Sequence, residues 1–277
     1  MRQSELNMQH ALEMATKAAH QAGEILRRML PIAVVREKGQ NDLVTDADIA
    51  AQSAIHGVLL QAFPEHDFVG EEDATHASTT RENRVAIPWQ WVVDPLDGTT
   101  NYAHGLHNFA TSIALTHHGR TVLGVVYDPM ADELYSALEG RGAWLNGKPL
   151  ACSRCVELGR ALVAASFPPK LQQESPEIRQ FLNILVECQS IRRLGSAALN
   201  LCYVGAGRLD GYWGSRLHAW DIAAGALVAV EAGAHICRHD GTQFDIWEGQ
   251  VLAASSATLA QSMVRCIHSR RNPTQDG

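Results

Sequence analysis

Two carboxylates lie three residues apart in the segment 94–100, which reads D-P-L-D-G-T-T. The apolar run before it, residues 91–93, predicts a buried strand. Because Pro95 cannot donate a ladder hydrogen bond, we expect that strand to end at the sheet edge and the chain to turn. Asp94 and Asp97 would then lie on the turn. Carboxylate oxygens are the ligands that hard cations such as Mg²⁺ prefer, so the turn is a candidate metal site.

Small residues after Asp97 favour an anion beside this candidate metal site. Gly98 and Thr99 open an expected helix, and the first N–H groups of a helix have no partner within it. A metal beside an anion site suits the hydrolysis of a phosphate ester. The segment therefore predicts phosphate-ester chemistry. An Asp-Pro turn with an ordinary helix cap is the alternative interpretation.

Three further acidic positions could contribute to the same site. Residues 70–73 read G-E-E-D, where a bound cation would relieve the repulsion between adjacent acids; a solvated loop is the alternative. Asp48 ends a T-D-A-D sequence that has the form of a capping box, so it could close a helix start or act as a base. Asp221 heads the small apolar helix expected at 220–230, as an N-cap or as a rigid ligand.

Composition restricts the class of protein. The chain has 277 residues, is 46% hydrophobic and carries a formal net charge of −7. That length can bury a sizeable core, and the negative charge disfavours a long nucleic-acid polymer or a membrane surface as partner. The sequence has neither a membrane-spanning apolar run nor the layout of a signal peptide, so we expect a cytoplasmic protein. Six cysteines with a single C-x-x-C, at 152–155, favour free thiols over zinc.

The order of elements predicts an α/β (α+β) fold in two halves. Closely spaced strands after residue 108 imply antiparallel pairing, and strands that alternate with helices after residue 161 imply an α/β second half. We expect an N-terminal half at 1–150 with most of the metal ligands, a C-terminal half at 151–268 with Asp221, and a tail at 269–277.

Other polar residues give weaker signals. Lys38 lies in a polar, turn-rich segment, residues 37–42, which we interpret as a loop that could form one wall of the site; a solvated charge is the alternative. Four histidines lack the spacing of a zinc site, so we expect them in surface or structural roles: His104, His107, His117 and His118.

Four motifs, in this order, resemble the inositol monophosphatase family of Mg²⁺-dependent phosphomonoesterases. They are K-x-x-N-D-L-V-T-x-A-D from residue 38, G-E-E from 70, D-P-L-D-G-T-T from 94 and W-D-I-A-A-G from 220. The resemblance extends from the first helix to about residue 265. It implies a layered αβαβα sandwich of the inositol monophosphatase and fructose-1,6-bisphosphatase type. It also implies two to three Mg²⁺ ions, a small phosphorylated metabolite as substrate, lithium sensitivity and a homodimer.

The resemblance assigns roles to the residues that match the motifs. The metal ligands would be Glu71, Asp94, the Leu96 carbonyl, Asp97 and Asp221. Gly98 and Thr99 would bind phosphate, and Asp48, Thr99 and Glu71 would be catalytic. Gly195, Ser196 and Ala197 match a segment near the alcohol portion of the substrate.

One position departs from the family pattern. Members that act on inositol phosphate often have an acid seven residues before the W-D aspartate, where this chain has Gly214. Trp213 and Arg216 would offer a stacking surface and a cation if both face the pocket. We therefore expect either inositol phosphate or another ester, such as histidinol phosphate, a 3'-phosphonucleotide or a sugar bisphosphate. A regulatory or RNA-associated binding protein on the same fold is the alternative function.

Overall fold

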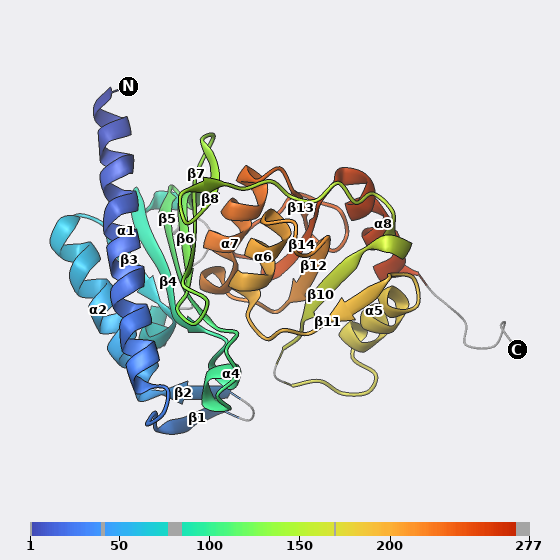
Figure 1. Cartoon of the computed structure of the whole chain (residues 1–277), viewed down its shortest axis with the longest axis horizontal. Helices are drawn as coiled ribbons and strands as arrows, with labels where there is room; N and C mark the ends of the chain where they lie inside the picture. Colours follow the sequence, from blue (N-terminus) through green and yellow to red (C-terminus); the bar gives the residue numbers. More distant parts are fainter. Residues whose placement is uncertain (1, 40–41, 77–84, 169, 270–277) are drawn as a thin grey trace, which may run out of the picture.

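The computed structural model describes residues 2–39, 42–76, 85–168 and 170–269, and two large sheets dominate this part of the chain (Figure 1). The first sheet has the strand order β3-β4-β5-β6-β7-β8-β9. Its strands are β3 (Asp67–Gly70), β4 (Trp89–Asp97), β5 (Ala110–His117), β6 (Arg120–Asp128), β7 (Glu133–Leu138), β8 (Gly142–Leu145) and β9 (Lys148–Pro149). β3 and β4 are parallel, and the later neighbours are antiparallel as the short strand spacing predicts.

The second sheet comes from the C-terminal half and has the order β11-β10-β12-β14-β13. Its strands are β10 (Leu162–Ser166), β11 (Ser190–Arg192), β12 (Gly211–Ser215), β13 (His235–Cys237) and β14 (Gln250–Ala254). β10 runs parallel to both β11 and β12, whereas β14 is antiparallel to β12 and β13. The carboxyl ends of β10 and β12 therefore lie at the same edge of this sheet.

Three pairs of helices complete the layers (Figure 1). Helices α1 (Arg2–Met29) and α2 (Asp46–Ala62) cover the outer face of the first sheet. Helices α6 (Ala197–Gly205) and α7 (Ala219–Glu231) lie between the two sheets, and α5 (Pro176–Leu185) and α8 (Ala257–His268) cover the far face of the second. This arrangement confirms the predicted αβαβα sandwich.

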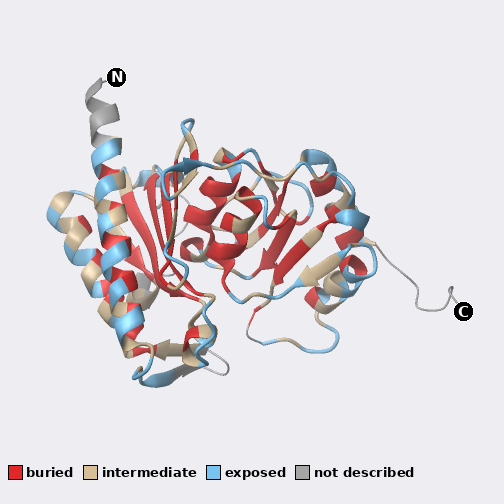
Figure 2. Cartoon of the chain, viewed as in Figure 1, coloured by how far each residue is buried: buried red, intermediate tan, exposed pale blue. Residues whose placement is uncertain are grey.

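The central pair of helices is buried on nearly all sides (Figure 2). Glycines allow the close approach: a Cβ atom on Gly124 of β6 would lie 2.7 Å from the Ala224 carbonyl oxygen, and one on Gly225 would lie 2.9 Å from the Ala198 carbonyl oxygen. Such contacts are shorter than van der Waals packing permits, so larger residues would force the layers apart. Helix α7, whose first turn carries Asp221, is thereby packed closely against the first sheet and against α6.

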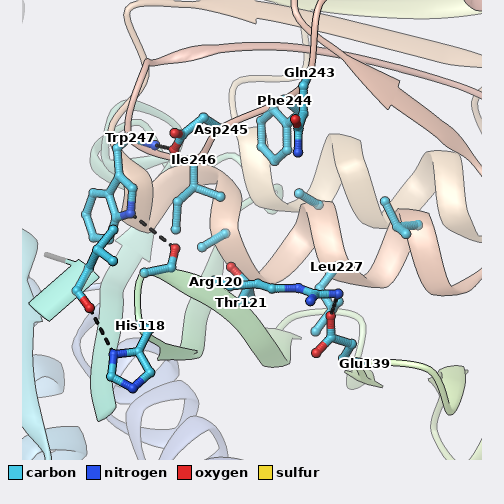
Figure 3. A pocket seen from close by; sticks show the side chains of 15 residues that line it. His118, Arg120, Thr121, Glu139, Leu227, Gln243, Phe244, Asp245, Ile246 and Trp247 are labelled. Atoms are coloured by element: carbon cyan, nitrogen blue, oxygen red, sulfur yellow. Dashed lines mark hydrogen bonds and ion pairs between the residues drawn. The ribbon is translucent and has the colours of Figure 1, made fainter. Parts of the chain in front are cut away.

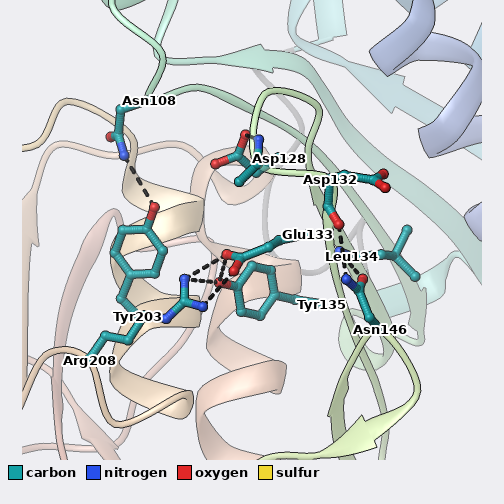
Figure 4. A network of polar contacts seen from close by, with 10 residues as sticks. Asn108, Asp128, Asp132, Glu133, Leu134, Tyr135, Asn146, Tyr203 and Arg208 are labelled. Carbon is teal, nitrogen blue, oxygen red and sulfur yellow. Dashed lines mark hydrogen bonds and ion pairs between the residues drawn. The ribbon is translucent and has the colours of Figure 1, made fainter.

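A polar network joins β7 of the first sheet to α6 and the residues after it (Figure 4). Arg208, which follows α6, donates hydrogen bonds of 2.6 and 2.5 Å to the two carboxylate oxygens of Glu133 at the start of β7. It also donates to the Tyr135 hydroxyl at 2.9 Å, and its guanidinium lies over the Tyr203 ring. A bidentate contact of this kind fixes orientation as well as distance.

The segment interpreted as a loop around Lys38 forms an antiparallel pair of strands, β1 (Val35–Gly39) and β2 (Asp42–Thr45). The loop prediction was wrong for the backbone because β-branched residues on both sides, including Val35 and Val44, can pair across a short connection. The Lys38 side chain lies outside the described residues.

Within the described ranges, no helix is both long enough and apolar enough to cross a membrane. All six cysteines are free, including Cys152 and Cys155.

Candidate active site

A cavity of about 740 Å³ lies where the two halves meet. From the N-terminal half it is lined by Leu43, Glu71, Asp94, Leu96, Asp97, Gly98, Thr99, Thr100, Asn101 and His104. From the C-terminal half it is lined by Ala165, Ser166, Phe167, Arg193, Gly195, Ala197, Leu217 and Asp221. The structure thus brings together acidic residues that lie up to 150 positions apart in the sequence.

Four acidic side chains face this cavity: Glu71, Asp94, Asp97 and Asp221. Burial raises the pKa of Asp94 well above its usual range, and repulsion from the other three carboxylates raises it further. The pKa of Asp221 is also well above its usual range, through burial and then repulsion from Asp97 and Glu71. Clustered negative charges of this kind favour a bound cation.

The turn that carries Asp94 differs from the predicted one. β4 does not end at Asp94: it continues to Asp97, with a register shift in its pairing with β5 between Asp94 and Asp97. Pro95 falls in this irregularity, where no ladder N–H is needed. The Leu96 N–H donates to the Asp94 carboxylate at 2.9 Å, which holds that side chain against its own turn.

Asp97 connects the two halves. Its carboxylate accepts hydrogen bonds from the Ser196 hydroxyl at 2.5 Å, the Ala198 N–H at 2.7 Å and the Ala197 N–H at 3.2 Å. Burial raises the pKa of Asp97 to about 6, and these three hydrogen bonds oppose the rise. Ser196 also caps α6, since its oxygen accepts from the Leu199 N–H at 3.1 Å. Ser196 is therefore buried behind Asp97, while its neighbours line the cavity.

Asp48 closes the start of α2, and its second carboxylate oxygen faces Thr99. Its carboxylate accepts from the Thr45 N–H at 2.9 Å and the Thr45 hydroxyl at 2.5 Å, which completes the capping box of α2. The Thr99 hydroxyl lies 3.4 Å from the other Asp48 oxygen and donates to the Leu96 carbonyl at 3.0 Å. Burial raises the pKa of Asp48 to about 6. A group with that pKa is suited to general-base work near neutral pH.

Two glycines hold the turn and the G-S-A segment together. Gly98 has φ of +99°, and Gly195 has φ of +94°. A Cβ atom on Gly195 would lie 2.5 Å from the Asn101 side-chain nitrogen. That nitrogen donates hydrogen bonds of 2.7 Å to the carbonyls of Asn108 and Leu194. Gly98 is the N-cap of α4 (Thr99–Ala103), so both predicted phosphate-binding residues lie at the start of this helix.

Asp221 lies in the first turn of α7 but is not the N-cap. His218 is the N-cap, and its N–H donates to the Asp221 carboxylate at 2.7 Å. The His218 ring stacks on Trp220 with centroids 4.7 Å apart. This reciprocal arrangement fixes the carboxylate as a capping box does.

The structure departs from the predicted substrate wall at Trp213 and Arg216, as it does at the buried Ser196. Trp213 is 1% exposed and packs in the hydrophobic cluster between the second sheet and its outer helices. The Arg216 side chain is exposed, and its Nε lies 3.4 Å from a carboxylate oxygen of the buried Glu177. Neither residue lines the cavity. The stacking surface and the cation expected from them are therefore absent from this wall.

Other cavity residues carried no motif in the sequence. Arg193 and Phe167 line the cavity together, and the Arg193 guanidinium carbon lies 5.2 Å from the centre of the Phe167 ring. His104, for which we expected a surface or structural role, lines the cavity while remaining exposed. The sequence feature that could have identified Arg193 as a cavity residue was its position two residues before the G-S-A segment.

The donor set fits Mg²⁺, which binds oxygen ligands: four carboxylates and the Leu96 carbonyl border one cavity. As the side chains lie, Asp94 is within hydrogen-bond reach of the Glu71 and Asp221 carboxyl groups. As the side chains lie in the described part of the chain, no group of three or more acidic, His or Cys residues is arranged so that it could hold a metal ion. The shared cavity and the mutual repulsion, rather than a preformed coordination sphere, support the fit.

A second cavity, of about 420 Å³, lies between α7, the turn from β5 to β6 and residues 243–247 (Figure 3). Its walls are largely apolar, with Leu227, Phe244 and Trp247 among them, and an ion pair joins Arg120 to Glu139 at its rim. It lacks the concentration of carboxylates found in the first cavity. The acidic cavity is therefore the candidate active site.

Comparisons with known proteins agree with this geometry. A model of the "Inositol monophosphatase family" matches residues 7–271. Nus factor SuhB of Salmonella typhimurium is 40% identical over 255 residues, which cover 90% of this chain and 92% of that protein. Inositol monophosphatase 2 of Solanum lycopersicum is 38% identical over 265 residues, which cover 94% of this chain and 99% of that one. The crystal structure of extragenic suppressor protein suhB from Bartonella henselae has a TM-score of 0.85 at 34% identity, over 95% of this chain and 100% of that one.

Proposed function

The chain belongs to the inositol monophosphatase family, and from that premise we propose that it hydrolyses a small phosphate monoester in a Mg²⁺-dependent reaction. The observation that supports this most directly is the convergence of Glu71, Asp94, Asp97 and Asp221 on the cavity that the Gly98 turn also lines. Four carboxylates without a cation would repel an anionic substrate, so the cavity suits a phosphate ester only when metal is bound.

The carboxylates and the Leu96 carbonyl would hold two to three Mg²⁺ ions. Bound metal would polarise the phosphate, lower the pKa of the attacking water and stabilise the leaving alkoxide. The backbone N–H groups of Gly98 and Thr99 would bind phosphate oxygens. The Thr99 hydroxyl, directed by the Leu96 carbonyl and close to Asp48, would orient the attacking water. Asp48 would then accept its proton.

Phosphate release tests the proposal. The purified chain is incubated with sugar, inositol, nucleotide and amino-alcohol phosphates, with Mg²⁺ or with EDTA. We expect release that requires Mg²⁺ and falls by at least about 10³-fold in Asp94→Asn, since that change removes one charge from the centre of the cluster. Release that persists at full rate in EDTA, or in Asp94→Asn, would contradict the proposal.

The relatives named Nus factor SuhB favour a second candidate, a regulatory or RNA-associated binding protein on the same fold. One variant distinguishes the two candidate functions. Asp94→Asn should abolish phosphate release, whereas binding through a surface partner should survive because Asp94 is buried. A chain that binds a partner and releases no phosphate from any ester would favour the second candidate.

We also propose, from the family alone, a homodimer and inhibition by lithium, which would compete with Mg²⁺. Sedimentation velocity tests the first property, and the Mg²⁺ dependence of phosphate release with and without lithium tests the second.

A further inference from the structure

Opposite charges divide the two sides of the candidate active site. The acids gather at the β4 turn, at the start of η1 (Glu71–His76) and at the start of α7. The wall that comes from β10 and the segment before α6 consists of Ala165, Ser166, Phe167, Arg193, Gly195 and Ala197. Arg193 is the charged residue of that wall. A substrate whose phosphate lies at the acidic side would place its alcohol portion beside this arginine.

Among the residues that the structure describes, no acidic side chain neutralises the Arg193 guanidinium. Other arginines pair with glutamates, namely Arg120, Arg208, Arg216 and Arg238. Arg193 forms no ion pair with any acidic side chain in the ranges that the structure describes, and its recorded partner is the face of the Phe167 ring. Stacking covers a face of the guanidinium but leaves its edge N–H groups free, and those groups bind carboxylate or phosphate in a fork.

The arginine is also held in place. Phe167 makes an edge contact with Phe181 of α5, at 5.6 Å between ring centres, which supports the surface under the guanidinium. On the other side, the Leu194 carbonyl accepts from Asn101, and Ser196 donates to Asp97. The backbone around Arg193 is thus tied to the same turn that would hold the metals. A cation fixed relative to the reacting phosphate can select among substrates.

We propose that Arg193 binds a second anionic group on the alcohol portion of the ester, so that the enzyme prefers substrates with two anionic groups over neutral polyol phosphates. This inference rests on the proposed phosphatase activity. It replaces Arg216 and Trp213 as the source of specificity, because one pairs with Glu177 and the other is buried. The cavity, at about 740 Å³, is large enough for a ligand of nucleotide size.

Matched pairs of esters test the inference. In each pair the scissile phosphate is the same and only the second anion differs: 2-phosphoglycerate against glycerol 2-phosphate, and adenosine 3',5'-bisphosphate against adenosine 3'-monophosphate, with the products identified. The measured quantity is the ratio of kcat/KM within each pair. We expect a ratio above about 10 in the natural chain, and a fall of about 10- to 100-fold in that ratio in Arg193→Ala, the size expected for a lost charge-assisted hydrogen bond.

Two further variants make the result specific. Arg192→Ala removes a neighbouring exposed charge whose guanidinium bonds to Ser190 and to the Ile191 carbonyl, and it should leave the ratio within about twofold of its original value. Arg193→Lys keeps the charge without the fork and should retain part of the preference. Equal ratios in Arg193→Ala and the natural chain, with esters still hydrolysed, would overturn the inference alone. No hydrolysis of any ester by the natural chain would overturn the proposed function and this inference with it.

Discussion

The hydrogen bond from Ser196 to Asp97 predicts a measurable difference between two helix caps. Ser196 caps α6 and also donates to the buried Asp97 carboxylate at 2.5 Å. Ser256 caps α8 in the same way, accepting from the Leu259 N–H at 3.2 Å, but its hydroxyl donates to the Cys155 carbonyl instead of to a carboxylate. Changing each serine to alanine removes one cap, and only Ser196→Ala also removes a bond to a charged group.

The magnitude follows from these contacts. Loss of a serine cap lowers the free energy of unfolding by about 1 kcal/mol. Loss of a hydrogen bond to a charged group adds about 1.5 to 3 kcal/mol, reduced here because Asp97 keeps the N–H groups of Ala197 and Ala198. We therefore expect a loss of about 2 to 4 kcal/mol for Ser196→Ala and of about 1 kcal/mol for Ser256→Ala, after which the Cys155 carbonyl still accepts from the Ser255 hydroxyl at 2.8 Å.

Urea unfolding at pH 8, followed by circular dichroism in EDTA, measures both values without a contribution from bound metal. The comparison requires equal slopes of unfolding free energy against urea concentration, so that the denatured states are equivalent. Equal losses for the two variants would show that the contact with Asp97 contributes nothing to stability. The account of Asp97 as the connection between the two halves would then be wrong.

Two other predictions concern packing and pH. Gly23→Ala should lower the free energy of unfolding by about 1 to 3 kcal/mol, because the new Cβ atom would collide with the Tyr127 ring. Gly57→Ala, also in a helix but with open space around it, should leave that free energy unchanged or raise it by up to about 1 kcal/mol. Thermal unfolding of both variants checks the difference. Burial lowers the pKa of His239, whose Nε2 donates to the Gly214 carbonyl, so the unfolded state binds more protons and the free energy of unfolding should fall as pH drops below about 6.5. Urea unfolding at pH 7.5 and 5.5 should show a smaller loss of this free energy in His239→Gln than in the natural chain. An equal loss in the two proteins would remove His239 as the cause.

Local motifs predicted much of the site. The Thr45 capping box and the opening of a helix at Gly98 each depend on neighbours within a few residues, so sequence alone describes them well, whereas the N-cap of α7 is His218 and not the expected Asp221. The resemblance added the order of layers, which the structure confirms. The continuation of β4 past Pro95 could not be read in the same way, since it depends on how β5 pairs across the irregularity.

The substrate wall shows why other predictions from the sequence were wrong. Successive residues in a strand point to opposite faces, so Tyr212 and Trp213 in β12 lie in different hydrophobic clusters. A stacking surface at Trp213 required its ring to face the cavity, and its burial in the cluster beneath the outer helices excludes that. Arg193 was missed because its place in the cavity depends on its stacking on Phe167 and on the hydrogen bond from Asn101 to the carbonyl of the next residue, Leu194, and both partners are distant in the sequence.

The central claim is that Glu71, Asp94, Asp97 and Asp221 together bind divalent cations in the cavity beside the Gly98 turn. The most direct measurement is a crystal structure of the chain with Mn²⁺ in place of Mg²⁺, with the ions located by anomalous scattering. The account predicts ions about 2.1 to 2.2 Å from oxygens of at least three of these four side chains. Mn²⁺ bound only elsewhere, with these carboxylates unligated at saturating metal, would contradict it.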